Sequence, residues 1–173
     1  MHFRTAAIED LPKIRKLYQE VSRHEGGITR VEPEITDDYI RNFLERSLDT
    51  GLIVVGEHPD HADELIAGIH AFKPGPAVFS HVLSDLTVVV QPAFQGKKIG
   101  RTIFTIFLED IGLNRPDIGR VELICRESNQ RAIKFYQSFG FRIEGRLEMR
   151  IKTTDGNYEA DIPMAWQNPN FEF

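Results

Sequence analysis

The sequence predicts an α/β fold in which a mixed sheet of about six or seven strands is flanked by about four helices. Segments with apolar residues at helical spacing alternate with short β-rich segments, in the order β-αα-βββ-α-β-α-ββ. Helices between strands require at least one parallel crossover, so the sheet should not be purely antiparallel. The chain has 173 residues, no internal repeat and no long Pro/Gly/Ser linker, so one domain is expected over residues 1–173.

Two helices, followed by three strands, are expected after the initial strand in the first half. Asp10 is a candidate N-cap for the first helix, which should stop at Gly26 and Gly27. Thr36 opens the second helix, which should end near Gly51. Both have apolar residues at helical spacing, which are Leu11, Ile14, Leu17, Tyr18 and Val21 in the first and Ile40, Phe43, Leu44 and Leu48 in the second. The strands should cover residues 52–56, residues 65–72 and a central segment ending at residues 87–90.

The second half predicts two further helices and the remaining strands. A strong helical stripe follows the loop at residues 95–101, formed by Ile103, Phe104, Phe107, Leu108 and Ile111. Residues 121–125 read as a buried strand, and Ser128 or Asn129 should cap a short helix that Gly140 stops. The last stretch alternates like strand, with a hairpin turn at residues 154–157 before a strand at residues 158–166.

Composition excludes several classes of protein. The chain is 41% hydrophobic and 27% charged, which is typical of globular proteins, and no apolar run is long enough to span a bilayer. The N-terminus lacks a signal-peptide core, so a cytoplasmic location without a membrane partner is expected. The single cysteine, Cys125, excludes an internal disulfide and a Cys-rich zinc site, and the His/Asp-rich loop at residues 58–64 reads as a solvated turn rather than a metal site.

One basic loop stands out in an acidic chain. The net charge of −5 argues against nucleic acid as a partner, yet residues 95–101 read Gln-Gly-Lys-Lys-Ile-Gly-Arg, with three cations and no anion. A loop between a strand and a helix offers free backbone N–H groups and the positive end of the helix dipole to an anion. Glycines at 96 and 100 let the backbone approach a phosphate. A capped turn with solvated cations explains the spacing about equally well.

The loop does not match the common nucleotide motifs. Its glycines are one residue too close for a Walker A loop, and the Gly-x-Gly-x-x-Gly fingerprint is absent. A phosphate-containing cofactor held without an obligatory metal fits better.

Two motifs resemble the GNAT superfamily of N-acetyltransferases. Residues 88–100, Val-Val-Val-Gln-Pro-Ala-Phe-Gln-Gly-Lys-Lys-Ile-Gly, are similar to its acetyl-CoA loop, [Gln/Arg]-x-x-Gly-x-[Gly/Ala] after a Val-rich strand. Lys98 is the departure, because the family usually has its first defining glycine there. Residues 127–141 resemble the family's Asn-x-x-Ala-Ile-x-[Leu/Phe]-Tyr-x-x-x-Gly-Phe helix. The strong resemblance covers residues 85–141, and the N-terminal half matches only in element order.

The resemblance implies a GNAT-like fold and an activity. Members of the family transfer an acetyl group from acetyl-CoA, a co-substrate, to an amine by direct attack through a tetrahedral intermediate, without a metal. The terminal segment is similar to members acting on small amines or protein N-termini, and a homodimer is common in the family. Acceptor specificity is expected in residues 26–38 and the terminal hairpin. The implied cofactor-binding residues are Val88, Val89, Val90, Gln95, Gly96, Lys97, Lys98, Ile99, Gly100, Arg101, Asn129 and Tyr136.

Catalytic roles follow from the same resemblance. A backbone N–H near residues 88–90 should bind the developing oxyanion, and Tyr136 matches the tyrosine that protonates the departing thiolate. Asp85 is the first candidate for the base that deprotonates the acceptor, with Glu122 as its rival and His81 third. Each of these groups also has an ordinary structural interpretation. The alternative function is a catalytically silent CoA-binding sensor, for which Lys98 is the warning sign.

Overall fold

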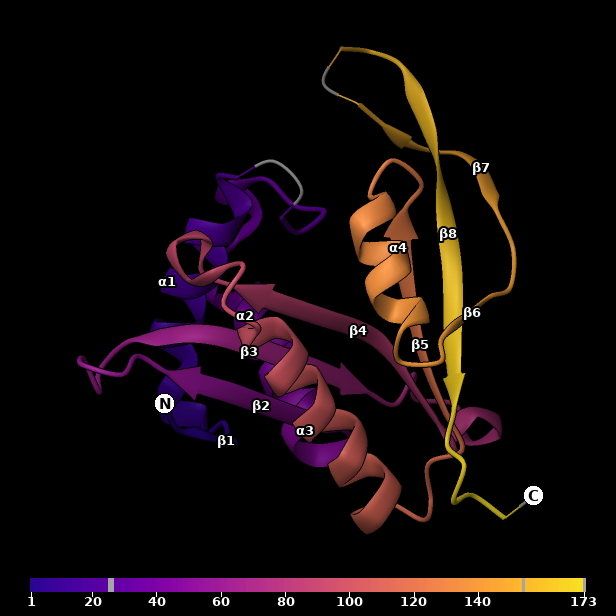
Figure 1. The fold of residues 1–173 in the computed structure, drawn as a ribbon, viewed down its shortest axis with the longest axis horizontal. Coiled ribbons are helices and arrows are strands. Elements are labelled where there is room, and N and C mark those ends of the chain that lie inside the picture. The colour runs from indigo at the N-terminus through magenta and orange to yellow at the C-terminus, as the bar shows by residue number, and fades with distance from the viewer. Residues whose placement is uncertain (25–26, 154, 173) are drawn as a thin grey trace.

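The computed structural model describes residues 1–24, 27–153 and 155–172. Eight strands in these ranges form one mixed sheet in the order β1-β2-β3-β4-β5-β8-β6, with β7 also paired to β8 (Figure 1). The helices are α1 (Leu11–Ser22), α2 (Asp37–Thr50), α3 (Ile99–Asn114) and α4 (Gln130–Gln137). The strands are β1 (Phe3–Thr5), β2 (Leu52–Glu57), β3 (Leu65–Phe72), β4 (Val82–Val90), β5 (Arg120–Arg126), β6 (Arg142–Ile143), β7 (Leu147–Lys152) and β8 (Tyr158–Gln167).

Helices cover both faces of the sheet. On one face α1 and α2 pack against a buried set that includes Ile53, Val55 and Val89. On the other face α3 and α4 pack against a set that includes Val54 and Ile69. Alternate residues of β2 thus enter opposite cores, as strand geometry requires. The predicted α/β class is confirmed, with slightly more strands than expected.

The sheet opens between β4 and β5. These parallel strands pair only at Val82 with Arg120 and at Leu83 with Val121. Beyond that point β4 and β5 diverge, and Figure 1 shows the two strands running away from each other. The divergence follows a bulge in β4, because Phe72 pairs with Ser84 whereas His70 pairs with Thr87. One extra residue therefore lies in β4.

The predicted helix boundaries in the first half are mostly right. The Thr36 hydroxyl accepts the Tyr39 N–H at 3.1 Å and caps α2, which ends at Gly51 as expected. Asp10 directly precedes α1, but its carboxylate accepts the Ala7 N–H at 2.8 Å and gives α1 no side-chain cap. The helix ends at Ser22, before the expected stop, of which Gly26 lies outside the described residues. Leu48, the last of the four residues at helical spacing in α2, is 40% exposed and lies outside the core.

The second half also follows the predicted order, with one addition. Asn129 rather than Ser128 caps α4, and Gly140 after the helix has a positive φ of 92°. The expected hairpin turn joins β7 to β8, with Gly156 at φ 86°, although Thr154 lies outside the described residues. The extra strand arises because residues 142–152 form two separate short strands on β8. None of the helices in the described ranges has the length and apolar character needed to cross a membrane.

A ring cluster fastens α3 to α4. Phe104 of α3 is fully buried, and its ring centroid lies between 4.6 and 5.8 Å from those of four other rings. These rings belong to Phe135, Tyr136, Phe139 and Phe141. Edge and tilted contacts of this kind add to the stabilisation that burial of the rings provides.

Replacing Phe104 by alanine should lower the free energy of unfolding by ~3–5 kcal/mol, because it leaves a cavity between α3 and α4. Phe104→Leu should cost less, about 1.5 kcal/mol, since more of the volume is kept. Leu113→Ala on the same helix is the control, because Leu113 is 77% exposed and should change stability by no more than ~0.5 kcal/mol. Urea unfolding measures all three, and a Phe104→Ala loss no larger than the control would contradict the assignment.

Candidate functional site

The diverging part of β4 presents backbone groups to the gap. The Gln91 N–H donates to the Ile66 carbonyl of β3 at 2.8 Å, and Val89 pairs with Gly68 two residues earlier in the ladder. In an antiparallel ladder the N–H groups of alternate residues point the same way. The Val89 N–H therefore points to β3, whereas the N–H groups of Val88 and Val90 point to the side from which β5 has separated. Buried donors without a strand partner require another acceptor.

Val88, Val89 and Val90 thus do not contribute alike to the predicted site. The side chains of Val88 and Val90 pack against the core under α3, whereas Val89 is buried in the core under α1 and α2. Only Val88 and Val90 direct backbone donors into the gap. The candidates for the predicted oxyanion donor are therefore the backbone N–H groups of these two residues.

The basic loop leads directly into α3. Lys98, the residue before the helix, has φ 65° and ψ 3° and gives the helix no side-chain cap. The first helical hydrogen bond runs from the Thr102 N–H to the Lys98 carbonyl at 3.0 Å. The N–H groups of Ile99, Gly100 and Arg101 precede it and have no helical partner. This arrangement favours an anion at the start of α3.

The glycines of the loop meet different requirements. Gly96 has φ 76°, and a Cβ there would meet nothing within 4 Å. A Cβ at Gly100 would lie 3.5 Å from Cγ2 of Val90, which is ordinary contact. Gly96 is thus required by the backbone, while Lys98 adopts a left-handed conformation that glycine would adopt at lower cost.

Aromatic rings orient two of the three cations. The Lys97 ammonium lies 4.7 Å from the ring centroid of Phe94, and the Arg101 guanidinium lies 4.9 Å from that of Phe139. Arg101 also donates to Oγ of Ser138 at 3.0 Å, which ties α3 to the end of α4. None of the three cations forms an ion pair with a described residue. Gln95 uses its side chain differently, donating to the Val90 carbonyl at 3.2 Å.

Tyr136 and Asn129 lie on α4, on the same face of the sheet as α3. Tyr136 packs against Phe104 and Phe141, and burial raises the pKa of its phenol, which the nearby Cys125 raises further. Its hydroxyl has no hydrogen-bond partner within the part of the chain that the structure describes. Asn129 accepts the Ala132 N–H at 3.1 Å, so it serves as the helix cap. Cys125 is buried with its pKa raised to about 11, and it is a core thiol rather than a nucleophile.

The structure separates the three candidate bases. Asp85 lies at the bulge of β4, with φ 56° and an exposed side chain. Glu122 lies on β5 and is held by Nε of Arg120 at 2.6 Å. His81 precedes β4 at its paired end, where its carbonyl accepts the Gly119 N–H at 2.9 Å. Only Asp85 is both at the opening and free of an ion pair with a described residue.

Asp85 and Glu122 lie on the face of the sheet opposite the basic loop at residues 95–101, which is called the phosphate loop below. Val121, Leu123 and Cys125 enter the core under α3 and α4, so Glu122 between them points to the other face. Asp85 is near Tyr39 of α2, since its charge contributes to the raised pKa of that phenol, whose main cause is burial. The gap between β4 and β5 therefore connects a cationic loop on one face with a carboxylate on the other.

The sequence analysis missed Arg30 and Tyr39 as site residues. The Arg30 guanidinium lies 4.2 Å from the ring centroid of Tyr39, in front of α2 and on the face of Asp85. Arg30 falls inside residues 26–38, where specificity was expected, but the contact with Tyr39 depends on the loop conformation. A tyrosine three residues after the cap residue Thr36 was the only available signal.

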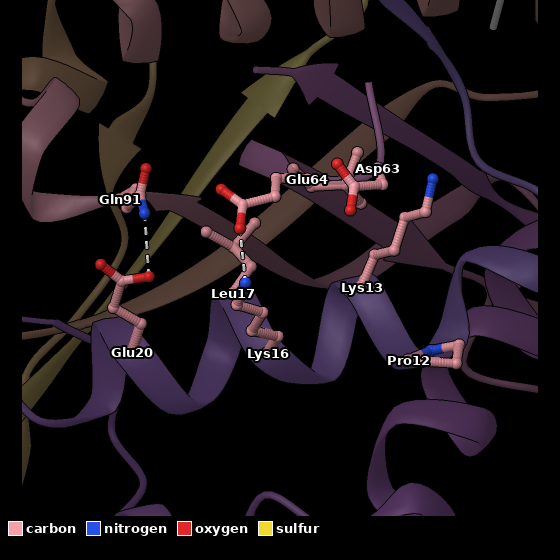
Figure 2. A pocket seen from close by; sticks show the side chains of 9 residues that line it. Pro12, Lys13, Lys16, Leu17, Glu20, Asp63, Glu64 and Gln91 are labelled. Atoms are coloured by element: carbon pink, nitrogen blue, oxygen red, sulfur yellow. Dashed lines mark hydrogen bonds and ion pairs between the residues drawn. The ribbon is translucent and has the colours of Figure 1, made fainter. Parts of the chain in front are cut away.

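A pocket lies between α1 and the loop joining β2 to β3. It has a volume of about 240 Å³, and Figure 2 shows its polar side chains directed at one another. Lys16 donates to Glu64 at 2.6 Å, and Gln91 donates to Glu20 at 2.9 Å. The Gln91 contact fastens the end of β4 to α1. The polar contacts across this pocket thus hold α1 against the end of β4 and the loop between β2 and β3.

The described residues contain no group of three or more His, Cys, Asp and Glu side chains placed to hold a metal ion. In the loop at residues 58–64, the His58 ring lies 4.5 Å from that of His61 and 5.1 Å from that of Phe94. Its Nδ1 accepts the Asp60 N–H at 3.1 Å. These contacts support the predicted turn.

Residues 11–141 match the sequence profile of the Acetyltransferase (GNAT) family. The chain belongs to this family. The GNAT fold accounts for the order of its elements, and acetyl-CoA is the co-substrate that its family implies. The phosphate loop and the open edge of β4 offer unpartnered backbone donors and unpaired cations to a polyanion that carries amide and thioester groups.

Individual relatives are distant. Spermidine N(1)-acetyltransferase from Escherichia coli (strain K12) is 27% identical over 85 residues, which cover 49% of this chain and 45% of the relative. The chain thus spans about half the length of the curated relatives it matches. A GNAT acetyltransferase structure from Streptococcus pneumoniae is 17% identical with a TM-score of 0.84, covering 96% of this chain and 98% of that one.

The yncA protein of Salmonella typhimurium, solved with its cofactor acetyl-CoA, is 19% identical with a TM-score of 0.82. That match covers 100% of this GNAT chain and 95% of the other. At these identities the structural matches establish the fold, and the acceptor of this chain has to be argued from its own residues.

Substitutions of Lys98 should separate its charge from its backbone conformation. Lys98→Gly and Lys98→Ala both remove the charge, but only glycine relieves the left-handed conformation. The glycine variant should therefore be more stable than the alanine variant by about 1 kcal/mol. Both should weaken acetyl-CoA binding to a similar extent. Urea unfolding and calorimetry measure the two effects, and equal stability of the variants would show that the backbone conformation carries no cost.

Proposed function

We propose that this GNAT chain is an N-acetyltransferase that moves an acetyl group from acetyl-CoA directly to an amine. The observation that carries the proposal is the open edge of β4, where the Val88 and Val90 N–H groups point into the gap. The phosphate loop and Tyr136 lie on one face of that gap and Asp85 on the other. Donor and acceptor can therefore approach one opening from opposite faces.

The chain offers separate groups to each part of acetyl-CoA. The free N–H groups at the start of α3, with Lys97, Lys98 and Arg101, would bind the phosphates. The open edge of β4 would hydrogen-bond the amide-bearing arm, and one of its N–H groups would stabilise the negative charge that develops on the thioester oxygen. Asn129 uses its carbonyl oxygen as a cap, which leaves its amide N–H₂ available to the same arm.

Two proton transfers remain, and each has a candidate. An ammonium cannot attack a thioester, so the acceptor must lose a proton, which Asp85 would accept directly or through water. Tyr136 would donate its proton to the departing sulfur. Burial keeps this phenol in its neutral O–H form, which is the form that a proton donor requires. These two groups also distinguish an enzyme from a silent CoA-binding sensor, which needs neither.

Tyr136→Phe should lower kcat by about 10²-fold or more while leaving acetyl-CoA affinity nearly unchanged, because only the proton donor is lost. Tyr158→Phe is the matched control, since Tyr158 is an exposed tyrosine on β8. Because burial raises the pKa of Tyr136, the wild-type rate should not fall near pH 10, where an ordinary tyrosine ionises. Thiol release measured from pH 6 to pH 10.5 tests both points. An unchanged kcat in Tyr136→Phe would remove this residue from the mechanism.

Asp85→Asn and Glu122→Gln compare the two carboxylates. Asp85→Asn should lower kcat/KM by about 10²-fold, with the loss largest at low pH, where more of the amine is protonated. Glu122 is already paired with Arg120, so Glu122→Gln should have a far smaller effect. Steady-state kinetics with one amine and both variants decides the assignment. A larger loss for Glu122→Gln would transfer the role of base to Glu122.

A further inference from the structure

An aromatic platform with opposite charges beside it lies on the acceptor face of the sheet. Tyr39 packs its ring against Phe43 at 5.4 Å and Tyr18 at 6.5 Å. Tyr18 and Phe43 are buried, and the Tyr18 hydroxyl is 2.9 Å from Nδ1 of His70. Burial lowers the pKa of His70 to about 3, so this platform stays uncharged at physiological pH. The Tyr39 ring is thus packed against rings that carry no charge.

The platform is connected to the opening of the sheet. His70 on β3 lies directly opposite Thr87 on β4, and the Thr87 hydroxyl donates to the Asp85 carbonyl at 3.1 Å. Asp85 is therefore connected to the ring cluster through Thr87, and its charge contributes to the raised pKa of the Tyr39 phenol. Tyr39 and the proposed base therefore lie on the same face of the sheet.

Arg30 supplies an unneutralised cation at this place. Its guanidinium lies 4.2 Å from the Tyr39 ring centroid. Nearby arginines are paired with acids, Arg23 with Glu32 at 2.5 Å and Arg15 with Asp37 at 3.1 Å. Arg30 has no ion pair with a described residue, neither with Asp85 nor with any other acid.

This pattern distinguishes between classes of acceptor. A polyamine would meet a like charge at Arg30, and the Tyr39 face that could bind an ammonium is already covered by the guanidinium. A peptide N-terminus has a neutral amide next to its amine and leaves Arg30 without a partner. A carboxylate matches the planar guanidinium in a bidentate manner, while the neighbouring ammonium meets Asp85.

We propose that the acceptor is a small amine that also carries a carboxylate, of which an α-amino acid is the simplest, and that Arg30 binds this carboxylate. The inference rests on the proposed acetyl transfer and names the substrate class of the same site. Arg30 acts in specificity, because it binds the acceptor away from the reacting nitrogen.

Matched acceptors test the proposal. L-leucine, L-leucinamide and 3-methylbutylamine share one side chain but carry a carboxylate, a neutral amide and a hydrogen next to the amine. Spermidine serves as the polyamine. The wild-type kcat/KM should be at least about 10-fold higher for leucine than for the amide or the amine, which is the range of one charge-assisted hydrogen bond. Kinetics with acetyl-CoA held at saturation gives each value.

Variants of Arg30 provide the second readout. Arg30→Gln should lower kcat/KM for leucine by about 10- to 100-fold, chiefly through KM, and leave the amide and the amine nearly unchanged. Arg30→Lys should retain part of the preference, because the charge remains without the bidentate geometry. Arg41→Gln is the matched control, an exposed arginine on α2 that faces Glu45. Circular dichroism verifies that every variant is folded.

The outcomes separate the two levels of the argument. Acetylation of spermidine or the amines at least as fast as leucine overturns the carboxylate proposal and leaves acetyl transfer standing. An equal loss for all acceptors in Arg30→Gln also overturns it. Failure of every amine in the panel to release CoA overturns the proposed function and the inference together.

Discussion

A single extra residue in β4 determines the architecture of the site. The bulge at Asp85 shifts the register of β4 against β3, and beyond it β4 diverges from β5, so that only two residue pairs join β4 to β5. Had β4 stayed paired with β5 along its whole length, the N–H groups of Val88 and Val90 would have donated to β5 and would be unavailable to a ligand. The conformation of Asp85, with φ 56°, is unfavourable for a non-glycine residue. A local cost in backbone energy therefore accompanies the opening at which we propose that both substrates meet.

Charges of opposite sign lie on the two faces of the opening. The chain has a net charge of −5, yet the cations of the loop at residues 95–101 lie at the start of α3, on one face. Asp85 lies on the other face, beside α2. A polyanionic donor is attracted to the first face and an ammonium to the second, so the two substrates do not compete electrostatically for one surface. Arg30 is an exception to this separation, because it places a cation on the same face as Asp85.

Periodicity was sufficient to predict the helices and most strands, because burial repeats every 3.6 or 2 residues. The caps at Thr36 and Asn129 were predictable from side-chain chemistry. The bulge left a signal that strict alternation overlooks, since Leu83, Leu86 and Val88 enter one core with spacings of three and then two. Local sequence could have indicated the pairing of Glu122 with Arg120, because residues two apart in a strand share a face. The contact of Arg30 with Tyr39 depends on loop conformation, which local sequence does not contain.

Helix α3 couples the two functions that the sequence motifs describe separately. Its first turn presents backbone donors to an anion, while Arg101 reaches Ser138 at the end of α4. One turn further, Phe104 packs against Tyr136. The proposed proton donor is thus positioned by the helix that is proposed to bind the phosphates. A shift of α3 that improves or weakens phosphate contacts must also move the contact surface of Tyr136, because buried rings transmit displacement rather than absorb it. Affinity for acetyl-CoA and the rate of acetyl transfer are therefore expected to change together when the loop at residues 95–101 is altered.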